Sequence, residues 1–96
     1  MNKYTFRLYI TGNSIKSKRA IANLFRICRE ELDDLYSVEI IDVLEQPYLA
    51  EQEKIIVTPT LIKQVPPPLQ RLIGDLTDTQ KVLLGLNLVR YDADFN

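Results

Sequence analysis

The chain has 96 residues, 46% of them hydrophobic and 26% charged, and its 12 Lys and Arg nearly balance its 13 Asp and Glu, for a net charge of −1. This balance gives no electrostatic basis for binding nucleic acid. Met1 to Phe6 do not resemble a signal peptide, and no eighteen apolar residues run together, so we expect one cytoplasmic domain, residues 1–96, without membrane insertion. A single cysteine excludes an internal disulfide, and the absence of histidine leaves no obvious zinc or haem ligand set.

The first half of the chain predicts a β-α-β unit. Apolar and polar residues alternate from Lys3 to Thr11, which indicates a strand. Gly12-Asn13-Ser14 supplies a turn and a helix N-cap, and a stripe at helical spacing then predicts a helix that ends near Asp33, with apolar positions at Ile21, Leu24, Phe25, Cys28 and Leu32. Cys28 is therefore expected in the core. The nearly continuous apolar run from Tyr36 to Leu44 predicts a second strand, parallel to the first and covered on both faces.

Charged residues in this half allow two interpretations each. Lys16, Lys18 and Arg19 lie in the first two turns of the predicted helix, where the helix dipole favours anions. They form either a binding site for an anion or acidic partner or, as we expect, a solvated basic face. Asp42 is either a buried carboxylate with a partner or, as we expect, the solvent-exposed end of the second strand.

The second half does not predict one structure. Pro47 can begin a short helix that runs through Lys54. The stretch from Leu69 to Leu76 fits a helical template, yet Arg71 to Ile73 can also serve as a strand. The stretch from Val82 to Val89 follows a capping box formed by Thr77 and Gln80 and fits a helix, but its apolar residues also alternate as in a strand. Either tertiary contacts settle these ambiguities, or two folds lie close in free energy.

Pro59 stands between two threonines, ahead of the apolar pair Leu61-Ile62. A proline can be the first residue of a strand, where no backbone N–H has to donate to a neighbouring strand. The sequence Thr58-Pro59-Thr60 is either such an ordinary trans-proline or the cis-proline that thioredoxin-like domains present at this kind of position.

Several blocks in order give the chain a more specific resemblance. Over essentially its full length it is similar to the KaiB family of circadian clock proteins. The blocks that carry the resemblance are Leu8-Tyr9-Ile10-Thr11-Gly12-Asn13, Ile41-Asp42-Val43-Leu44, Leu49-Ala50-Glu51, Thr58-Pro59-Thr60-Leu61, Ile73-Gly74-Asp75-Leu76 and Lys81-Val82-Leu83 with Gly85-Leu86.

The resemblance implies an α/β, thioredoxin-like fold with element order βαβαββα in one state and βαββααβ in a second, tetrameric state. Residues 1–45 would then form an invariant β-α-β half, residues 46–91 a fold-switching half and residues 92–96 a short acidic tail. It further implies a non-enzymatic regulator that exists as a tetramer or dimer in equilibrium with a monomer. This regulator would bind a KaiC-type hexameric ATPase, modulate its phosphorylation and ATPase cycle, and capture KaiA.

The resemblance also assigns residues. Those expected to bind the ATPase lie on the helix that begins at Pro47: Pro47, Tyr48, Gln52 and Lys54. An edge strand with Ser37 and Glu39 would dock a third protein by strand addition. The positions that set the balance between the two folds are Tyr4, Gly85, Asn87 and Arg90.

Three of these positions depart from the family pattern. Asn87 replaces an aspartate, Arg90 replaces a tyrosine and Glu39 replaces a lysine. A reversed charge at a docking strand can reject a partner, so we expect a KaiA-type partner to be absent. A KaiB-like paralogue that works without KaiA, in stress adaptation, is therefore an alternative to a clock oscillator component.

Two other classes of protein are alternatives. A domain cut from a KaiB-like sensor histidine kinase shares the expected fold, although Met1 and the short tail argue against it. A redox enzyme needs a low-pKa thiol at the N-terminus of the first helix, and Asn13-Ser14-Ile15-Lys16 contains none. A glutathione-binding role that uses Pro59 is the remote remaining possibility. We expect no cofactor and no metal, since the sequence has no glycine-rich phosphate loop and no histidine base.

Overall fold

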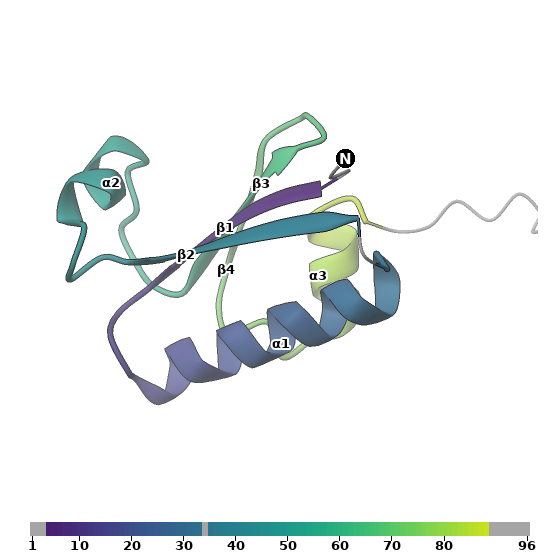
Figure 1. Cartoon of the computed structure of the whole chain (residues 1–96), viewed down its shortest axis with the longest axis horizontal. Coiled ribbons are helices and arrows are strands. Elements are labelled where there is room, and N and C mark those ends of the chain that lie inside the picture. Colours follow the sequence, from purple (N-terminus) through teal and green to yellow (C-terminus); the bar gives the residue numbers. More distant parts are fainter. Residues whose placement is uncertain (1–3, 34, 89–96) are drawn as a thin grey trace, which may run out of the picture.

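The computed structural model of the protein describes residues 4–33 and 35–88. These residues form a mixed sheet and flanking helices (Figure 1), namely β1 (Tyr4–Ile10), α1 (Ile15–Glu31), β2 (Tyr36–Asp42), α2 (Pro47–Gln52), β3 (Thr60–Val65), β4 (Gln70–Ile73) and α3 (Thr79–Gly85). This order, βαβαββα, is the first of the two that the resemblance implied. The expected fold class is therefore confirmed.

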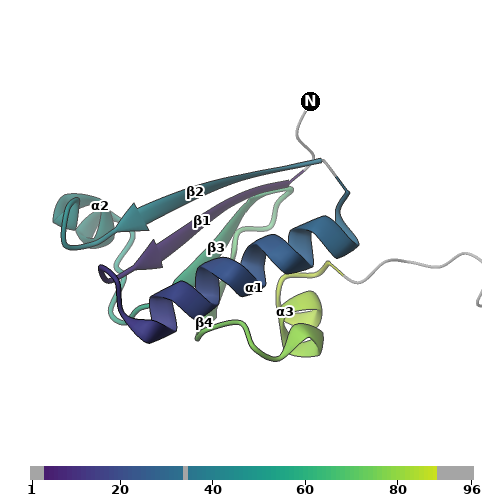
Figure 2. The same cartoon turned by 60° about the horizontal axis from the view of Figure 1, so that its bottom comes forward.

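The sheet has the strand order β2-β1-β3-β4. Strand β1 is parallel to β2, to which α1 provides the crossover, and antiparallel to β3, which in turn is antiparallel to β4. The β-α-β unit expected from the first half of the sequence is thus present. Helices α1 and α3 lie against one face of the sheet, whereas α2 lies beyond one end of it (Figures 1 and 2).

The main core lies between the sheet and the helices α1 and α3. Alternate residues of β1 point into it and meet residues from both helices: Phe6, Leu8, Ile10, Leu24, Ile27, Cys28, Leu61, Val82 and Leu86. A smaller cluster on the opposite face joins Tyr9, Ile41 and Ile62, against which Leu49 and Ile55 pack. The two clusters follow from the period of two along each strand.

Helix α1 begins as expected. The Ser14 side chain caps it by accepting a hydrogen bond from the Ser17 N–H at 3.1 Å. The predicted apolar stripe is correct at Leu24 and Cys28, but the structure shifts it slightly, because Ala20 and Ile27 are buried while Ile21 and Phe25 are only half-buried.

Strand β2 differs from the prediction. It ends at Asp42 and not at Leu44, and Ile41 is its only buried residue. It is an edge strand of the sheet, as the resemblance implied. The chain turns there because the Asp42 carboxylate accepts hydrogen bonds from the N–H groups of Gly12 and Leu44 at 3.1 and 3.0 Å. Apolar contacts are present on both faces of the strand as expected, since Val38 and Ile40 pack against the main core and Ile41 lies in the smaller cluster. Asp42 also lies at the strand's end.

The ambiguous stretches of the second half each take one structure. Residues 70–73 form a strand paired with β3, and residues 79–85 form a helix. The expected capping box is absent, because Asp75 accepts both the amide and the hydroxyl of Thr77. Asp78 caps α3 instead, with its carboxylate accepting the Lys81 N–H at 3.2 Å.

Candidate partner-binding site

Helix α2 has four exposed residues and two half-buried ones, Leu49 and Ala50. None of its residues is buried, and the Tyr48 side chain is 60% exposed. Pro47 occupies the first helical turn, where its missing N–H leaves no hydrogen bond unmade. Gln52 ends the helix and is exposed. A helix that presents an aromatic side chain to solvent has the character of a docking surface.

Lys54 has a backbone role that is separate from its charge. It lies one residue beyond the cap of α2 with a φ of 56°. Its N–H donates to the Glu51 carbonyl at 3.1 Å, and the Ile55 N–H donates to the Ala50 carbonyl at 2.8 Å, which together form a Schellman motif. The side chain is exposed, so its ammonium remains available to a partner.

Beside α2 lies a small cleft of about 170 Å³. Its lining comes from the ends of β1 and β2, from α2 and from the loop before β3: Thr11, Val43, Ala50, Ile55, Ile56, Val57 and Thr58. Within this loop the Ile56 side chain is 95% exposed. The sequence alone does not predict this cleft. The only local feature there is the apolar run Ile55–Val57, which predicts burial. We use the name α2 surface for Pro47, Tyr48, Gln52 and Lys54 together with Ile56.

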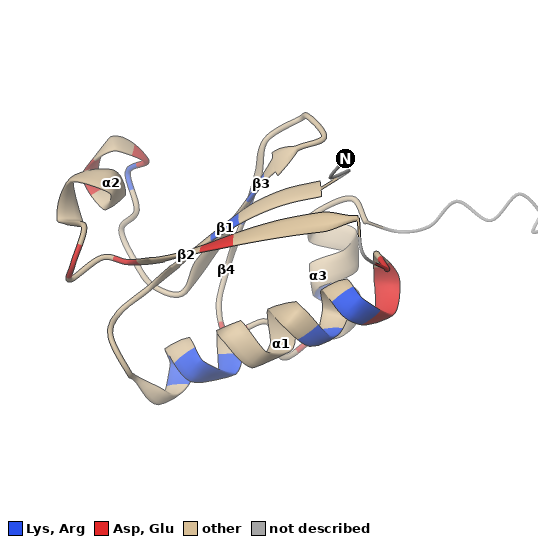
Figure 3. Ribbon diagram, viewed as in Figure 1, with Lys and Arg blue, Asp and Glu red and all other residues tan. Residues whose placement is uncertain are grey.

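Carboxylates surround the α2 surface (Figure 3). Glu45 and Glu51 are exposed, and Glu53 lies 3.5 Å from an Arg71 Nη2, which also donates to the Glu53 carbonyl. Lys54 and Arg71 are the cations beside these carboxylates. The end of the molecule around α2 thus combines exposed apolar side chains with mainly negative charge.

Pro59 is buried near the same end, and the Thr58–Pro59 peptide bond is cis. The Pro59 carbonyl accepts the Gly74 N–H at 3.0 Å, and the hydroxyls of Thr11 and Thr58 lie 2.5 Å apart. The turn that would carry a redox thiol instead holds Ser14, the cap of α1. Cys28 lies in the core, where burial raises the pKa of its thiol to about 12. It is therefore a protonated, inaccessible core residue.

Ser37 and Glu39 lie on the edge strand. In register they stand opposite Thr5 and Arg7 of β1. The Arg7 Nε lies 3.0 Å from a Glu39 carboxylate oxygen, and the Glu39 side chain is 56% exposed. The outer side of β2 carries unpaired backbone groups within the described sheet, as strand addition requires.

Two of the positions expected to control fold choice are element ends, since Tyr4 begins β1 and Gly85 ends α3, and helix α3 lies away from α2 (Figures 1 and 2). The Tyr4 ring stacks on Phe6 with centroids 6.3 Å apart. Gly85 ends α3, and a Cβ there would lie 3.1 Å from the Leu72 Cδ1. Asn87 follows α3 with a φ of 59°, and Arg90 lies outside the described residues.

Within residues 4–33 and 35–88, no group of three or more His, Cys, Asp or Glu side chains could hold a metal ion. In the same part of the chain, no helix is long and apolar enough to cross a membrane.

The solved structures similar to this chain include the N-terminal domain of Synechococcus elongatus SasA, with a TM-score of 0.73, 25% identity and coverage of 96% of this chain and 90% of that domain. They also include mitochondrial thioredoxin 3 from Saccharomyces cerevisiae, with a TM-score of 0.71, 17% identity and coverage of 93% and 81%. The fold is therefore thioredoxin-like.

Curated relatives give closer matches. The circadian clock protein KaiB3 of Synechocystis sp. is 70% identical over 89 residues, which cover 93% of this chain and 87% of that protein. The circadian clock oscillator protein KaiB of Prochlorococcus marinus (strain MIT 9312) is 50% identical over 86 residues, covering 90% and 82%. The sequence model of the KaiB domain matches residues 7–88. The chain belongs to the KaiB family.

Proposed function

We propose that this chain is a non-enzymatic regulator that binds a KaiC-type hexameric ATPase through the α2 surface and modulates its phosphorylation and ATPase cycle in a cytoplasmic timing system. The observation that carries the proposal is α2 itself, a helix with no buried residue and an exposed Tyr48. Relatives of this chain are named as circadian clock proteins. An exposed aromatic side chain is the kind of anchor that dominates protein interfaces. The exposed Ile56 lines the cleft beside the same helix.

We further propose that residues 46–91 have a second arrangement in a tetramer or dimer, in which the whole chain has the element order βαββααβ. The sequence supports this, since residues 69–76 fit a helical template although the structure contains a strand there. The packing supports it too, because β4 and α3 leave large apolar side chains exposed that another arrangement can bury: Leu69, Ile73 and Leu84, at 54%, 65% and 66%.

A paralogue that works without a KaiA partner, in stress adaptation, is the second candidate. The chain is more similar to a relative named KaiB3, at 70% identity, than to one named circadian clock oscillator protein KaiB, at 50%. Glu39 supports the same candidate, because its carboxylate already pairs with Arg7 and would oppose an acidic partner strand. A sensor histidine kinase system is a further partner class, consistent with the fold shared with the SasA N-terminal domain.

The test is a binding measurement between this chain and a KaiC-type ATPase with ATP. Lys54→Glu should weaken binding by roughly tenfold, and Tyr48→Ala by roughly thirtyfold. Lys18→Glu is the matched control, since it makes the same charge change on an exposed lysine of α1. Equal affinity of the Lys54 and Lys18 variants would remove Lys54 from the interface, and absence of binding by the unaltered chain would overturn the proposed function.

A further inference from the structure

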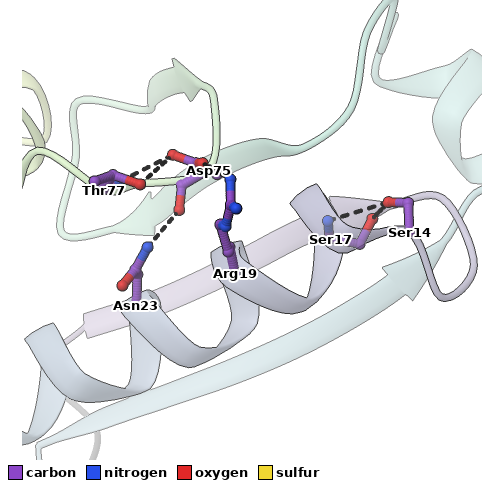
Figure 4. Close-up of polar contacts among 6 residues, drawn as sticks. All are labelled: Ser14, Ser17, Arg19, Asn23, Asp75 and Thr77. Carbon is purple, nitrogen blue, oxygen red and sulfur yellow. Dashed lines mark hydrogen bonds and ion pairs between the residues drawn. The ribbon is translucent and has the colours of Figure 1, made fainter.

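Helix α1 directs a stripe of polar side chains at the segment between β4 and α3. Arg19, Asn23 and Arg26 are spaced by four and three residues, which places them on one helix face. The Asn23 Nδ2 donates to the Asp75 carbonyl at 2.8 Å, and an Arg19 Nη1 lies 3.7 Å from the Asp75 carboxylate (Figure 4). The Arg26 Nη2 donates to the Thr79 hydroxyl at 3.2 Å. The N-terminal half of the chain thus holds the segment from Asp75 to Thr79.

Asp75 is fixed from several directions. One carboxylate oxygen accepts the Thr77 hydroxyl and N–H at 2.6 and 3.1 Å (Figure 4). These hydrogen bonds, followed by the charges of Arg19 and Lys16, lower the pKa of the carboxyl. Just before it, the Gly74 N–H donates to the Pro59 carbonyl at 3.0 Å. The junction is therefore tied by polar contacts to α1 and to the start of β3.

The same junction contains backbone strain and empty volume. Leu76 has a φ of 66° although it is buried in the main core. This left-handed conformation costs a residue with a side chain about 1 kcal/mol or more. A cavity of about 210 Å³ lies between β4 and α3, lined by residues from Leu72 to Val82. This cavity is open to solvent, whereas Leu76 and Val82 in its lining are buried. The polar contacts on either side of Leu76 therefore restrain a residue whose backbone is strained.

We propose that Arg19, Asn23 and Arg26 form a clamp that holds the β4–α3 junction, and that β4 and α3 leave the rest of the fold as one unit when the clamp opens. The name clamp refers to these three residues and their contacts with Asp75 and Thr79. The clamp acts within the isolated chain and does not depend on the ATPase, so a failure of the proposed function leaves it untouched. If the second arrangement of residues 46–91 exists, the clamp favours the arrangement seen here.

Hydrogen exchange of the whole chain, followed residue by residue by NMR, tests the clamp. In Asn23→Ala, the amides of β4 and α3 should exchange about three to ten times faster, the effect of one lost hydrogen bond. Alanine also has a higher helix propensity than asparagine. Because α1 is helical both before and after β4 and α3 are released, this higher propensity does not change the free energy of their release. Thr79→Val, which removes the acceptor of Arg26 at similar shape, should act in the same direction.

Ser14→Ala is the matched control. It removes the α1 cap, worth about 1 kcal/mol, without touching the junction. It should speed exchange in β1 and α1, which open only by global unfolding, and leave β4 and α3 unchanged. The proposal is overturned if Asn23→Ala leaves β4 and α3 unchanged. It is equally overturned if Ser14→Ala speeds them as much as β1, because the junction would then open only with the whole molecule.

Discussion

The Arg7 guanidinium and the Glu39 carboxylate meet across β1 and β2 with 3.0 Å between Nε and Oε1, on the strand that forms one edge of the sheet. The pair is largely solvent-exposed, so it contributes little to stability, at most about 1 kcal/mol. Its effect is on charge, because the edge strand carries a negative group at Glu39, where the resemblance implies a positive one.

We therefore expect that the complex of this chain with a KaiC-type ATPase does not bind a KaiA-type protein. The Glu39→Lys variant should raise the affinity of the complex for the KaiA-type protein at least roughly tenfold. A titration of the KaiA-type protein into the preformed complex measures this. Glu30→Lys, an equal charge change on α1, serves as the control and should gain nothing. Tight capture by the unaltered chain would contradict the role assigned to Glu39.

The Gly85→Ala variant should stabilise the observed arrangement by about 0.5–1 kcal/mol, because alanine has the higher helix propensity. The new methyl group would lie 3.1 Å from the Leu72 Cδ1, but Leu72 borders the cavity at the junction and can shift. Urea unfolding measures the gain, and sizing should show more monomer if a tetramer exists. Gly74→Ala should act oppositely, since Gly74 has a φ of 125°. A loss of stability in Gly85→Ala would mean that Leu72 cannot move.

Local pattern was sufficient for the first half of the fold because each segment there fits only one period. β1 alternates and α1 carries a single stripe, and both formed as expected. In the second half, residues 69–76 fit two periods, and the choice comes from tertiary contact. Leu72 pairs in register with Leu61 of β3, and this ladder satisfies backbone groups that a helix would otherwise satisfy internally.

The candidate site was predictable only where the backbone constrains it. Pro47 marks the first turn of α2 from sequence alone. The exposure of Ile56 had no local signal, because an apolar run predicts burial and only the arrangement of neighbouring elements leaves it in solvent. Asp75 is similar, since its contacts with Asn23 span 52 residues of sequence.

Asn87 closes α3 with a second Schellman motif. Its N–H donates to the Leu84 carbonyl at 3.2 Å, and the Leu88 N–H donates to the Leu83 carbonyl at 2.7 Å. Asn87→Gly should keep or slightly raise stability, whereas Asn87→Val should lose about 1–2 kcal/mol, because a β-branched residue tolerates a φ of 59° poorly. Urea unfolding of the two variants checks the difference. Equal stability would mean that this motif does not hold the end of α3.

Asparagine also suits this position better than the aspartate that the resemblance implies, because a negative charge at a helix C-terminus is unfavourable by about 0.3–1 kcal/mol. The departure at position 87 should therefore favour the arrangement seen here. Asn87→Asp should shift exchange of the α3 amides towards faster rates, and unchanged rates would rule out this direction.

Cys28 should resist thiol reagents in the folded protein. It is fully buried, and burial raises the pKa of its thiol to about 12, so the reactive thiolate is scarce at neutral pH. Labelling with an aromatic disulfide reagent should be slow in buffer and fast in urea, with a rate that follows the population of opened molecules. Lys18→Cys, at an exposed position of α1, is the positive control and should react rapidly in buffer. Rapid labelling of Cys28 in buffer would contradict the packing of α1 against the sheet.

Asp75 should make stability depend on pH in a defined direction. Hydrogen bonds from Thr77, and then the charges of Arg19 and Lys16, lower its pKa below the ordinary value of 3.8. A carboxyl whose pKa is lowered by folding binds fewer protons in the folded state than in the unfolded state. Its contribution to stability is therefore present at pH values above the unfolded-state pKa and is lost as the pH falls through the folded-state pKa. The unaltered chain should therefore exceed Asp75→Asn in stability at neutral pH, and the difference should vanish in acid. Urea midpoints of both proteins between about pH 7 and pH 2 measure this, and the other carboxylates titrate in both proteins and cancel. A difference that persists at the lowest pH would show that the charge of Asp75 does not stabilise the junction.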